Sequence, residues 1–278
     1  MIRSRRLVIV VVLLLLVSSA ALAQRRRGRG RYREAELPRA GVPEWQNEKG
    51  FERDVFTFVR VIYGSYGGYG RWGGGWATDY PDSDFNFSFR LQQLTSLKVN
   101  PDPVKLELTD ERLFDYPFLY LIEPGGLYFE EAEVLALRKY CQQGGFLMVD
   151  DFWGEDEWEN FREQLKRVFP DREAEELPLE HEIFHCVYDL EEKPQVPSIH
   201  HAQGLRGTGI TWERHDAQTP HYKAIHDDKG RIMVLVCHNT DLGDGWEREG
   251  EDEWYFKEFA EKKSYPMGIN IVFYAMTH

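Results

Sequence analysis

The apolar residues between positions 57 and 169 follow two alternating patterns. Short runs of nearly continuous apolar residues are typical of strands buried on both faces of a parallel sheet. They alternate with segments in which apolar residues recur at helical spacing. The predicted strands are residues 57–63, 104–108, 117–122 and 146–149, and the predicted helices are residues 82–97, 130–145 and 155–169. This alternation predicts an α/β fold with a mostly parallel central sheet and helices on both faces.

The pattern loosens after Pro170. Residues 183–190 (IFHCVYDL) are predicted to form a strand. Residues 222–237 are predicted to form a hairpin that turns at residues 227–230 (DDKG) and has a strongly apolar second strand. Residues 265–278 begin with Tyr-Pro and are apolar on nearly every side, which predicts a buried C-terminal helix.

Residues 1–23 have the three parts of an export signal peptide. An arginine-bearing start is followed by an apolar stretch and by Ala21-Leu22-Ala23, which is a small-x-small cleavage site. The mature chain is therefore expected to begin at Gln24 and to be periplasmic or otherwise extracytoplasmic. The alternative is an uncleaved anchor, because the 17 residues from Leu7 to Ala23 could just span a membrane.

Residues 24–50 are rich in Arg, Gly and Pro and are predicted to be a linker, which leaves residues 51–278 as the folded domain. The six arginines of residues 24–33 could contact a membrane or an anionic envelope polymer. The rest of the chain is acidic: from Glu34 onward 25 basic residues stand against 47 acidic ones, a net charge of −22, compared with −13 for the whole chain. Such a domain is not expected to bind nucleic acid, and cations, neutral glycans or basic partners suit it better.

The three cysteines, Cys141, Cys186 and Cys237, are too few for a disulfide framework. They leave two possibilities, which are one bridge between Cys186 and Cys237 or three small buried thiols. Cys237 also precedes His238 at the end of a predicted strand. Adjacent side chains in a strand point apart, so this pair is not expected to act as nucleophile and base.

Two adjacent aspartates, Asp150 and Asp151, follow the predicted strand FLMV (146–149). The carboxyl ends of parallel strands meet at one edge of a sheet, and ligands usually bind there. We therefore expect an acidic crevice, rimmed by aromatic side chains, at this edge. Its candidate ligand-binding residues are Asp79, Glu123, Asp150, Asp151, Trp153, His238, Asn239 and Asp241.

The aspartate pair has two interpretations. In the structural one, one carboxylate caps the helix that starts near Glu155 and the other accepts a hydrogen bond from a loop N–H. In the functional one, Asp150 and Asp151 bind Mg²⁺ or Ca²⁺, which prefer oxygen ligands, or the hydroxyl groups of a sugar. Because adjacent side chains diverge, a single ion would need further ligands from the neighbouring strand ends.

Five stretches, in chain order, carry a resemblance to a known family: WATDYPDSDFNFSFRLQQLT, FLYLIEPGG, GGFLMVDDFWG, LEHEIFH and TDLGDGWE. On the basis of these stretches, residues 51–278 resemble the bacterial family named domain of unknown function 4159. That family is similar to the ThuA-like proteins of the class I glutamine amidotransferase-like superfamily. The resemblance implies a three-layer, flavodoxin-like sandwich and no known reaction. Amidotransferases carry a nucleophilic cysteine in the turn after the matching strand, whereas residues 150–154 here are DDFWG, so glutamine hydrolysis is not expected.

Two further motifs match catalytic patterns only in part. Residues 64–81 contain seven glycines but neither an in-register G-x-G-x-x-G nor a P-loop lysine, so a lid or rim is expected there rather than a phosphate site. Residues 181–185 (HEIFH) match the H-E-x-x-H pattern of zinc peptidases. Pro178 and the β-favouring residues that follow favour instead a loop leading into a strand. Five further histidines are expected at the surface: His200, His201, His215, His221 and His226.

Three hypotheses for function follow. The first is an exported, amidotransferase-like domain that binds a small molecule, a glycan or another envelope component and lacks amidotransferase activity. The second is a hydrolase, metal-assisted or carboxylate-based, that works in the same crevice. The third is an interaction module whose acidic face binds a basic partner.

Overall fold

A computed structural model describes residue 39 and residues 41–50, 54–65 and 75–278. The predicted export signal, the alternative anchor and the linker arginines of residues 24–33 lie outside these residues, as do residues 66–74 of the glycine-rich segment 64–81. Among the described residues, no helix is both long and apolar enough to cross a membrane. The folded unit runs from Arg39 to His278.

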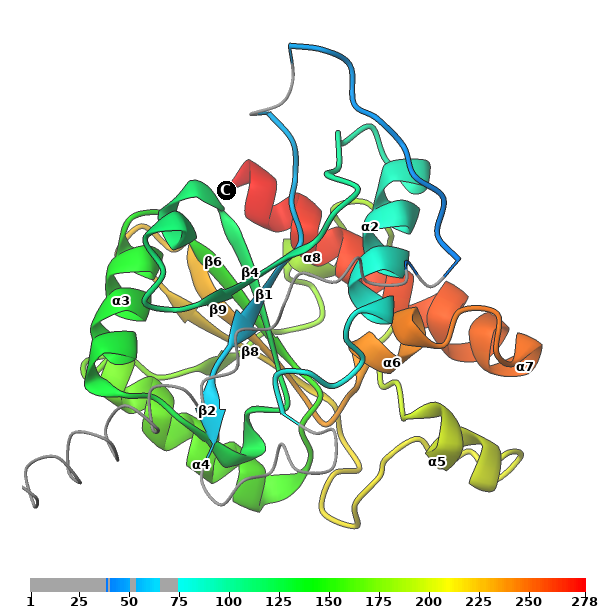
Figure 1. The fold of residues 1–278 in the computed structure, drawn as a ribbon. Coiled ribbons are helices and arrows are strands. Elements are labelled where there is room, and N and C mark those ends of the chain that lie inside the picture. Colours follow the sequence, from blue (N-terminus) through cyan, green and yellow to red (C-terminus); the bar gives the residue numbers. More distant parts are fainter. Residues whose placement is uncertain (1–38, 40, 51–53, 66–74) are drawn as a thin grey trace, which may run out of the picture. The chain divides into compact units, whose positions relative to one another are not determined.

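Within the described residues, seven strands form the central sheet (Figure 1). Five of them are parallel and lie side by side, and two antiparallel strands extend the sheet at one edge. All residues of β4, β6 and β9 are buried, as their nearly continuous apolar sequences require. The predicted α/β class with a mostly parallel sheet is confirmed. The order across the sheet is β3 (Val104–Glu107), β1 (Val59–Ile62), β4 (Phe118–Ile122), β6 (Phe146–Asp150), β9 (Ile232–His238), β8 (His221–His226) and β7 (Glu175–Glu176).

Helices cover both faces of this sheet (Figure 1). Successive strand residues point to opposite faces, so Leu119 and Leu121 of β4 belong to one apolar core, whereas Phe118 and Tyr120 belong to the other. The first core includes α3 (Glu131–Gln142) and α4 (Gly154–Val168), and the second includes α2 (Asp82–Leu94), α6 (Leu242–Glu247) and α8 (Tyr265–Thr277). The helices predicted near these positions are confirmed.

The chain reverses its direction across the sheet between β1 and β4. From β1 it passes through α2 to the edge strand β3, and then returns across β1 to β4, β6 and β9. The short helices η2 (Glu111–Asp115) and η3 (Pro124–Gly126) lie before and after β4. Loops that leave the carboxyl ends of β1 and β4 therefore diverge, and this is the edge at which open α/β sheets bind ligands.

Residues 183–190 do not form the predicted strand. A single 3₁₀ turn, η4 (Glu182–Phe184), is followed by turns and bends. Asn270 of α8 takes the backbone groups that a neighbouring strand would have paired. Its Oδ1 accepts hydrogen bonds from the N–H groups of Val187 (3.1 Å) and Tyr188 (2.8 Å), and its Nδ2 donates to the Tyr188 carbonyl (2.8 Å). The segment is thus a loop that is hydrogen-bonded to a buried helix. The apolar pattern of the segment alone cannot distinguish such a loop from a strand.

The predicted hairpin and C-terminal helix are confirmed. In the turn between β8 and β9, the Asp227 side chain accepts hydrogen bonds from the N–H groups of Lys229 (2.8 Å) and Arg231 (3.0 Å). The mostly buried helix α8 continues from α7 (Glu253–Tyr255) and from the wider helical turns of η5 (Phe256–Ser264). A short helix, α5 (Ile199–Gly204), and a small antiparallel pair, β2 (Gly64–Ser65) with β5 (Leu127–Tyr128), complete the described elements.

All three cysteines are free. Cys141 and Cys237 are fully buried, and the Cys186 thiol lies 3.2 Å from the Asn270 carbonyl oxygen. Of the two possibilities for these residues, the structure therefore contains separate thiols rather than a Cys186–Cys237 bridge.

Candidate cation site

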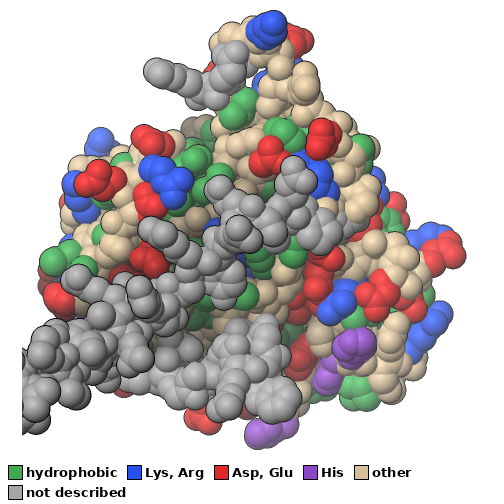
Figure 2. All heavy atoms as spheres, viewed as in Figure 1, with side chains coloured by type: hydrophobic (Ala, Val, Ile, Leu, Met, Phe, Trp, Pro, Cys, Tyr) green, Lys and Arg blue, Asp and Glu red, His purple; other side chains and the backbone are tan. Residues whose placement is uncertain are grey.

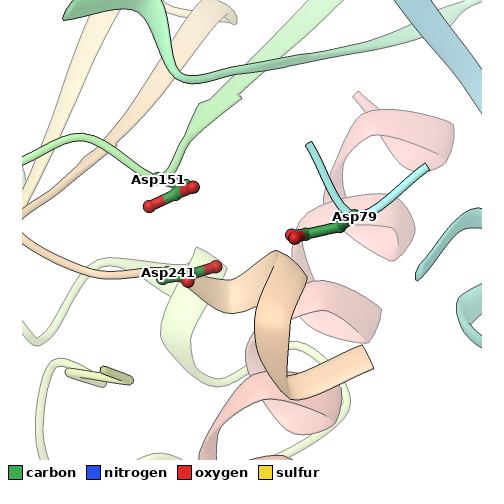
Figure 3. A group of neighbouring side chains, drawn as sticks. All are labelled: Asp79, Asp151 and Asp241. Atoms are coloured by element: carbon green, nitrogen blue, oxygen red, sulfur yellow. The ribbon is translucent and has the colours of Figure 1, made fainter. Parts of the chain in front are cut away.

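Three aspartates from separate parts of the chain converge beside the carboxyl end of β6 (Figure 3). Asp79 lies before α2, Asp151 follows β6, and Asp241 follows β9 and is the N-cap of α6. One carboxylate oxygen of each residue lies within 4.8 Å of the other two. We call these three residues the acidic cluster. The sequence predicts all three at this edge of the sheet, and the structure brings them together.

Uncommon backbone conformations occur in the loops around the acidic cluster. Asp79, Glu123, Asp151 and Asn239 have φ values of 61°, 50°, 54° and 61°, and they are the non-glycine residues with positive φ in the described part of the chain. This left-handed conformation costs about 1 kcal/mol or more for a residue with a side chain. All four belong to loops that follow parallel strands at one edge, which indicates that the surrounding structure holds these turns in place for the side chains they carry.

The adjacent residues Asp150 and Asp151 have different surroundings. Asp150 is fully buried, and its Oδ2 accepts hydrogen bonds from the Tyr120 hydroxyl (3.1 Å) and from the N–H of Gly243 (3.0 Å) at the start of α6. Burial raises the pKa of Asp150 to about 7. Asp151 is partly exposed and faces Asp79 and Asp241.

Each interpretation of the pair therefore describes part of the structure. Asp150 accepts a hydrogen bond from a backbone N–H, but at the start of α6 rather than of α4, and it does not belong to the acidic cluster. That Asp150 and Asp151 both bind Mg²⁺ or Ca²⁺ stays a prediction, and the structure groups only Asp151 with Asp79 and Asp241. Side chains of adjacent residues diverge, and Asp151 is grouped with residues from other loops.

Charge repulsion is concentrated in the acidic cluster. Withdrawal from water, followed by the charge of neighbouring carboxylates, raises the pKa of all three aspartates well above the ordinary value of 3.8. At Asp151 the largest contribution after burial comes from Glu123. Arg60 lowers the pKa of Asp79, because its positive charge favours the ionised carboxylate. Repelling carboxylates at this distance favour either a bound proton or a bound cation.

Arg60 of β1 supports the loop that carries Asp79. Its side chain is fully buried and forms an ion pair with the equally buried Asp84, whose two oxygens lie 3.1 and 3.0 Å from the Arg60 Nε. Its Nη1 donates hydrogen bonds to the carbonyl oxygens of Trp76 (3.1 Å) and Thr78 (2.8 Å). These carbonyls shortly precede Asp79, so the ion pair fixes the backbone from which the Asp79 carboxylate extends.

Asp79 Oδ2 is buried and has no hydrogen-bond partner among the described residues. A buried polar atom without a partner is costly, and it indicates a position where a ligand can bind. The backbone of Gly243 lies close to this oxygen. A Cβ atom on Gly243 would stand 2.6 Å from Asp79 Oδ2 and 2.7 Å from the Tyr120 hydroxyl oxygen. Glycine at position 243 therefore allows Asp79 to approach α6.

A second group of carboxylates shares Asp79 but is already paired. Oxygens of Asp79, Asp244 and Glu247 lie within 4.8 Å of one another. The Nε of Arg248 lies 3.3 Å from Asp244 Oδ1 and 2.7 Å from Glu247 Oε2. The guanidinium of Arg248 thus supplies the positive charge in this group, which makes the acidic cluster the stronger candidate for a metal ion.

Glu123, Trp153 and Asn239 surround the acidic cluster without joining it. The Glu123 carboxylate accepts a hydrogen bond from the N–H of Gly75. The Trp153 side chain is 4% exposed and its Nε1 donates to Asp151 Oδ1 (3.3 Å), so this ring is not open for stacking on a sugar. Asn239 Oδ1 accepts a hydrogen bond from the N–H of Gly154 (2.9 Å).

His238 lies apart from the acidic cluster. Its ring packs against Phe152 and Trp158, with centroid separations of 4.7 and 5.7 Å, and its Nε2 donates to the Gly154 carbonyl oxygen (3.0 Å). Burial lowers the pKa of His238 from 6.5 to about 4, and His221 and Lys223 also lower it. The structure therefore separates this predicted site residue from the others.

The two histidines of the H-E-x-x-H segment do not share a helical face. His181 is the N-cap of η4, and its Nδ1 accepts a hydrogen bond from the N–H of Ile183 (3.2 Å). His185 Nδ1 contacts Asp189 (2.5 Å), and its Nε2 donates to the Leu179 carbonyl (2.7 Å). The predicted loop is confirmed at this point, although no strand follows it. Of the other histidines, His200 and His215 are exposed, as predicted, and the remaining three are half-buried.

The prediction from sequence missed several residues that shape this region: Arg60, Tyr120, Gly243, Asp244 and Glu247. Three of them lie in TDLGDGWE (240–247), where acidic residues and glycines directly follow a buried strand, and this composition was the available signal. Nothing in the local sequence distinguishes Arg60 or Tyr120 from other strand residues, because their roles arise from contacts with distant segments.

A protein-family model described as Domain of unknown function (DUF4159) matches residues 57–276, which include the whole acidic cluster. No curated protein matches the chain.

Proposed function

This chain belongs to the DUF4159 family, and we propose that it is an extracytoplasmic binding protein that holds Ca²⁺ or Mg²⁺ in the acidic cluster. Through that cation it binds a hydroxyl-rich small molecule, such as a glycan or another component of the cell envelope. One observation carries the proposal. Asp79, Asp151 and Asp241 present oxygens within 4.8 Å of one another, and the buried Oδ2 of Asp79 has no hydrogen-bond partner among the described residues.

The spacing of these oxygens suits a hard cation. Ca²⁺ binds oxygen ligands at about 2.4 Å, so two ligands on opposite sides of the ion are about 4.8 Å apart. Three aspartates supply only part of the roughly six to eight oxygen ligands that Ca²⁺ takes. The remaining positions suit water and the hydroxyl groups of a ligand, which a cation can bind in pairs.

We also propose that the fold is a flavodoxin-like sandwich of the class I glutamine amidotransferase-like, ThuA-like type. The order of the five parallel strands supports this, because when they are counted in chain order it is 2-1-3-4-5. The turn after β6 carries Asp150 and Asp151, not a cysteine, and Cys237 is fully buried. We therefore propose binding rather than glutamine hydrolysis for this chain.

The proposal places the domain outside the cytoplasm, on the basis of the signal-like residues 1–23. The arginine-rich linker then contacts anionic lipid or envelope polymer near the domain. N-terminal sequencing of the protein from its native host tests this. A mature chain that begins at Gln24 supports export with cleavage, whereas an intact Met1 in the membrane fraction supports the uncleaved anchor.

Metal-dependent stability tests the cation site. The purified protein is stripped of metal with a chelator, and its thermal unfolding is then measured with added Ca²⁺ or Mg²⁺. An ion that binds only the folded state, at a free concentration of about 100 times its Kd, adds about 2.7 kcal/mol of stability. We expect one of the two ions to stabilise the parent protein and to lose this effect in each of the variants Asp79→Asn, Asp151→Asn and Asp241→Asn.

Asp171→Asn is the matched control, because it removes one exposed aspartate outside the acidic cluster. This variant should keep the full response to the ion. If neither ion stabilises the parent protein, or if Asp171→Asn loses the response as the cluster variants do, the proposed cation site is wrong.

The second candidate function is hydrolysis at the same edge of the sheet. The observation that favours it is the raised pKa of the clustered aspartates, because a protonated carboxyl beside an ionised one can serve as general acid and base. Product formation from neutral glycosides, measured with the parent protein and with Asp151→Asn, separates the two functions. Turnover that Asp151→Asn abolishes while the protein stays folded would favour the hydrolase. Saturable binding without turnover would favour the binding protein.

A further inference from the structure

Side chains of the protein occupy three consecutive amide groups at the start of α4. The N–H of Trp153 donates to Glu157 Oε2 (2.9 Å) and that of Glu155 donates to Asp216 Oδ2 (3.1 Å). Between them, the N–H of Gly154 donates to Asn239 Oδ1 (2.9 Å). The start of a helix after a parallel strand is where α/β proteins usually bind phosphate and other anions. Two carboxylates and one amide oxygen fill that position here.

These three side chains come from different parts of the fold and are held in place. Glu157 is ion-paired with Arg214. Asn239 Nδ2 donates to the Thr219 carbonyl oxygen (2.9 Å). Gly154 has a φ of +79°, and a Cβ atom there would stand 2.9 Å from both carboxylate oxygens of Asp216. Asp216 therefore packs closely against Gly154 while it accepts the hydrogen bond of the Glu155 amide.

The negative charge around the acidic cluster also disfavours the binding of an anion. In addition to the aspartates of the acidic cluster, Glu123 and Glu213 contribute negative charge at Asp151. In the space-filling view, Asp and Glu side chains gather in the region of α6 (Figure 2). One divalent cation neutralises only two of these carboxylates, so the surroundings remain negative after it binds.

From this geometry we infer that the site selects uncharged or cationic ligands and excludes anionic ones, with Glu157 and Asp216 as the residues that determine this specificity. The inference rests on the proposed function, because it concerns the chemistry of the ligand held beside the cation. A neutral polyol or an amino-bearing sugar meets this requirement. A sugar phosphate or a nucleotide would have to displace two carboxylates from the α4 amides.

Inorganic phosphate, in the absence of divalent cations, is the probe. Thermal unfolding is measured with phosphate and with chloride at matched ionic strength for the parent protein and for the double variant Glu157→Ala/Asp216→Ala. The substitutions free two amides of α4 and the Arg214 guanidinium. We expect phosphate to stabilise the double variant against thermal unfolding, with an apparent Kd at least tenfold lower than for the parent protein.

Glu159→Ala/Glu163→Ala is the matched control, because it removes two exposed carboxylates from α4 without freeing these amides. It should respond to phosphate as the parent does. If the double variant does not fold, the single variant Asp216→Ala is used instead, because Asp216 lies in an exposed loop. Equal stabilisation of parent and variant by phosphate, or no stabilisation of the variant, would overturn the inference.

Calcium and magnesium titrations of the same proteins test the cation site separately. Neither Glu157 nor Asp216 belongs to the acidic cluster, so the response to the ion should survive in the double variant. Loss of the ion response in every protein would contradict the proposed function and leave the phosphate comparison intact.

Discussion

Substituting His238 with phenylalanine is expected to make the folded protein more resistant to acid. The His238 side chain is 1% exposed and packs between Phe152 and Trp158. Its Nε2 donates to the Gly154 carbonyl oxygen, and its Nδ1 is buried without a hydrogen-bond partner among the described residues. Protonation would place a charge and an unpaired N–H at Nδ1, which is why burial lowers the pKa of His238 from 6.5 to about 4.

The direction and size of the effect follow from this difference. In the unfolded chain the histidine takes up a proton as the pH falls through 6.5, whereas in the folded chain it does so only near 4. Between these values the unfolded state binds more protons, so folding stability falls with the pH by about 1.4 kcal/mol per unit. The total loss caused by His238 is roughly 3 kcal/mol. Nearby His221, Lys223 and Glu176 are present in both proteins, so their contributions largely cancel in the comparison.

Urea unfolding, followed by tryptophan fluorescence at several values between about pH 7.5 and pH 4.5, measures this effect. The free energy of unfolding of His238→Phe minus that of the parent protein should rise steadily as the pH falls. His200→Gln is the control, because His200 is exposed, and its difference from the parent should stay flat. A flat difference for His238→Phe would refute the reasoning. Loss of cation binding in this variant would return His238 to the site.

Two further predictions concern the geometry of the site and the H-E-x-x-H segment. Gly243→Ala should weaken cation binding at least tenfold, about 1.4 kcal/mol, because its Cβ would meet Asp79 Oδ2 at 2.6 Å. Gly245→Ala is the control for titration calorimetry, since its Cβ would crowd Ser264 at 2.6 Å and should lower stability without changing the Kd for the cation. Glu182→Gln should change the free energy of unfolding by less than about 0.5 kcal/mol, because the Glu182 side chain is 60% exposed, and should remove no peptidase activity. Stoichiometric zinc that is lost when either His181 or His185 is substituted would contradict the loop assignment.

The position of the acidic cluster within the fold was predictable from the sequence alone. The alternation of apolar runs with helical spacing predicts a parallel sheet, and a parallel sheet collects the carboxyl ends of its strands at one edge. Asp151 directly follows the strand β6, and Asp241 lies three residues after the second strand of the predicted hairpin, so both were expected at this edge without knowledge of the packing. The same local signals predicted the hairpin at Asp227 and the buried helix α8, because turn chemistry and apolar periodicity act over a few residues.

Only the tertiary structure decided which side chains act together. Asp150 and Asp151 look equivalent in the sequence, but strand geometry turns one toward Tyr120 and α6 and the other toward Asp79. The segment 183–190, predicted as a strand, is a loop in which Asn270, more than 80 residues away, accepts hydrogen bonds from the N–H groups of Val187 and Tyr188. A local pattern records how apolar a segment is but not which distant donor, acceptor or charge packs against it. For that reason the partners of buried polar groups in this protein follow from its packing and not from the order of its residues.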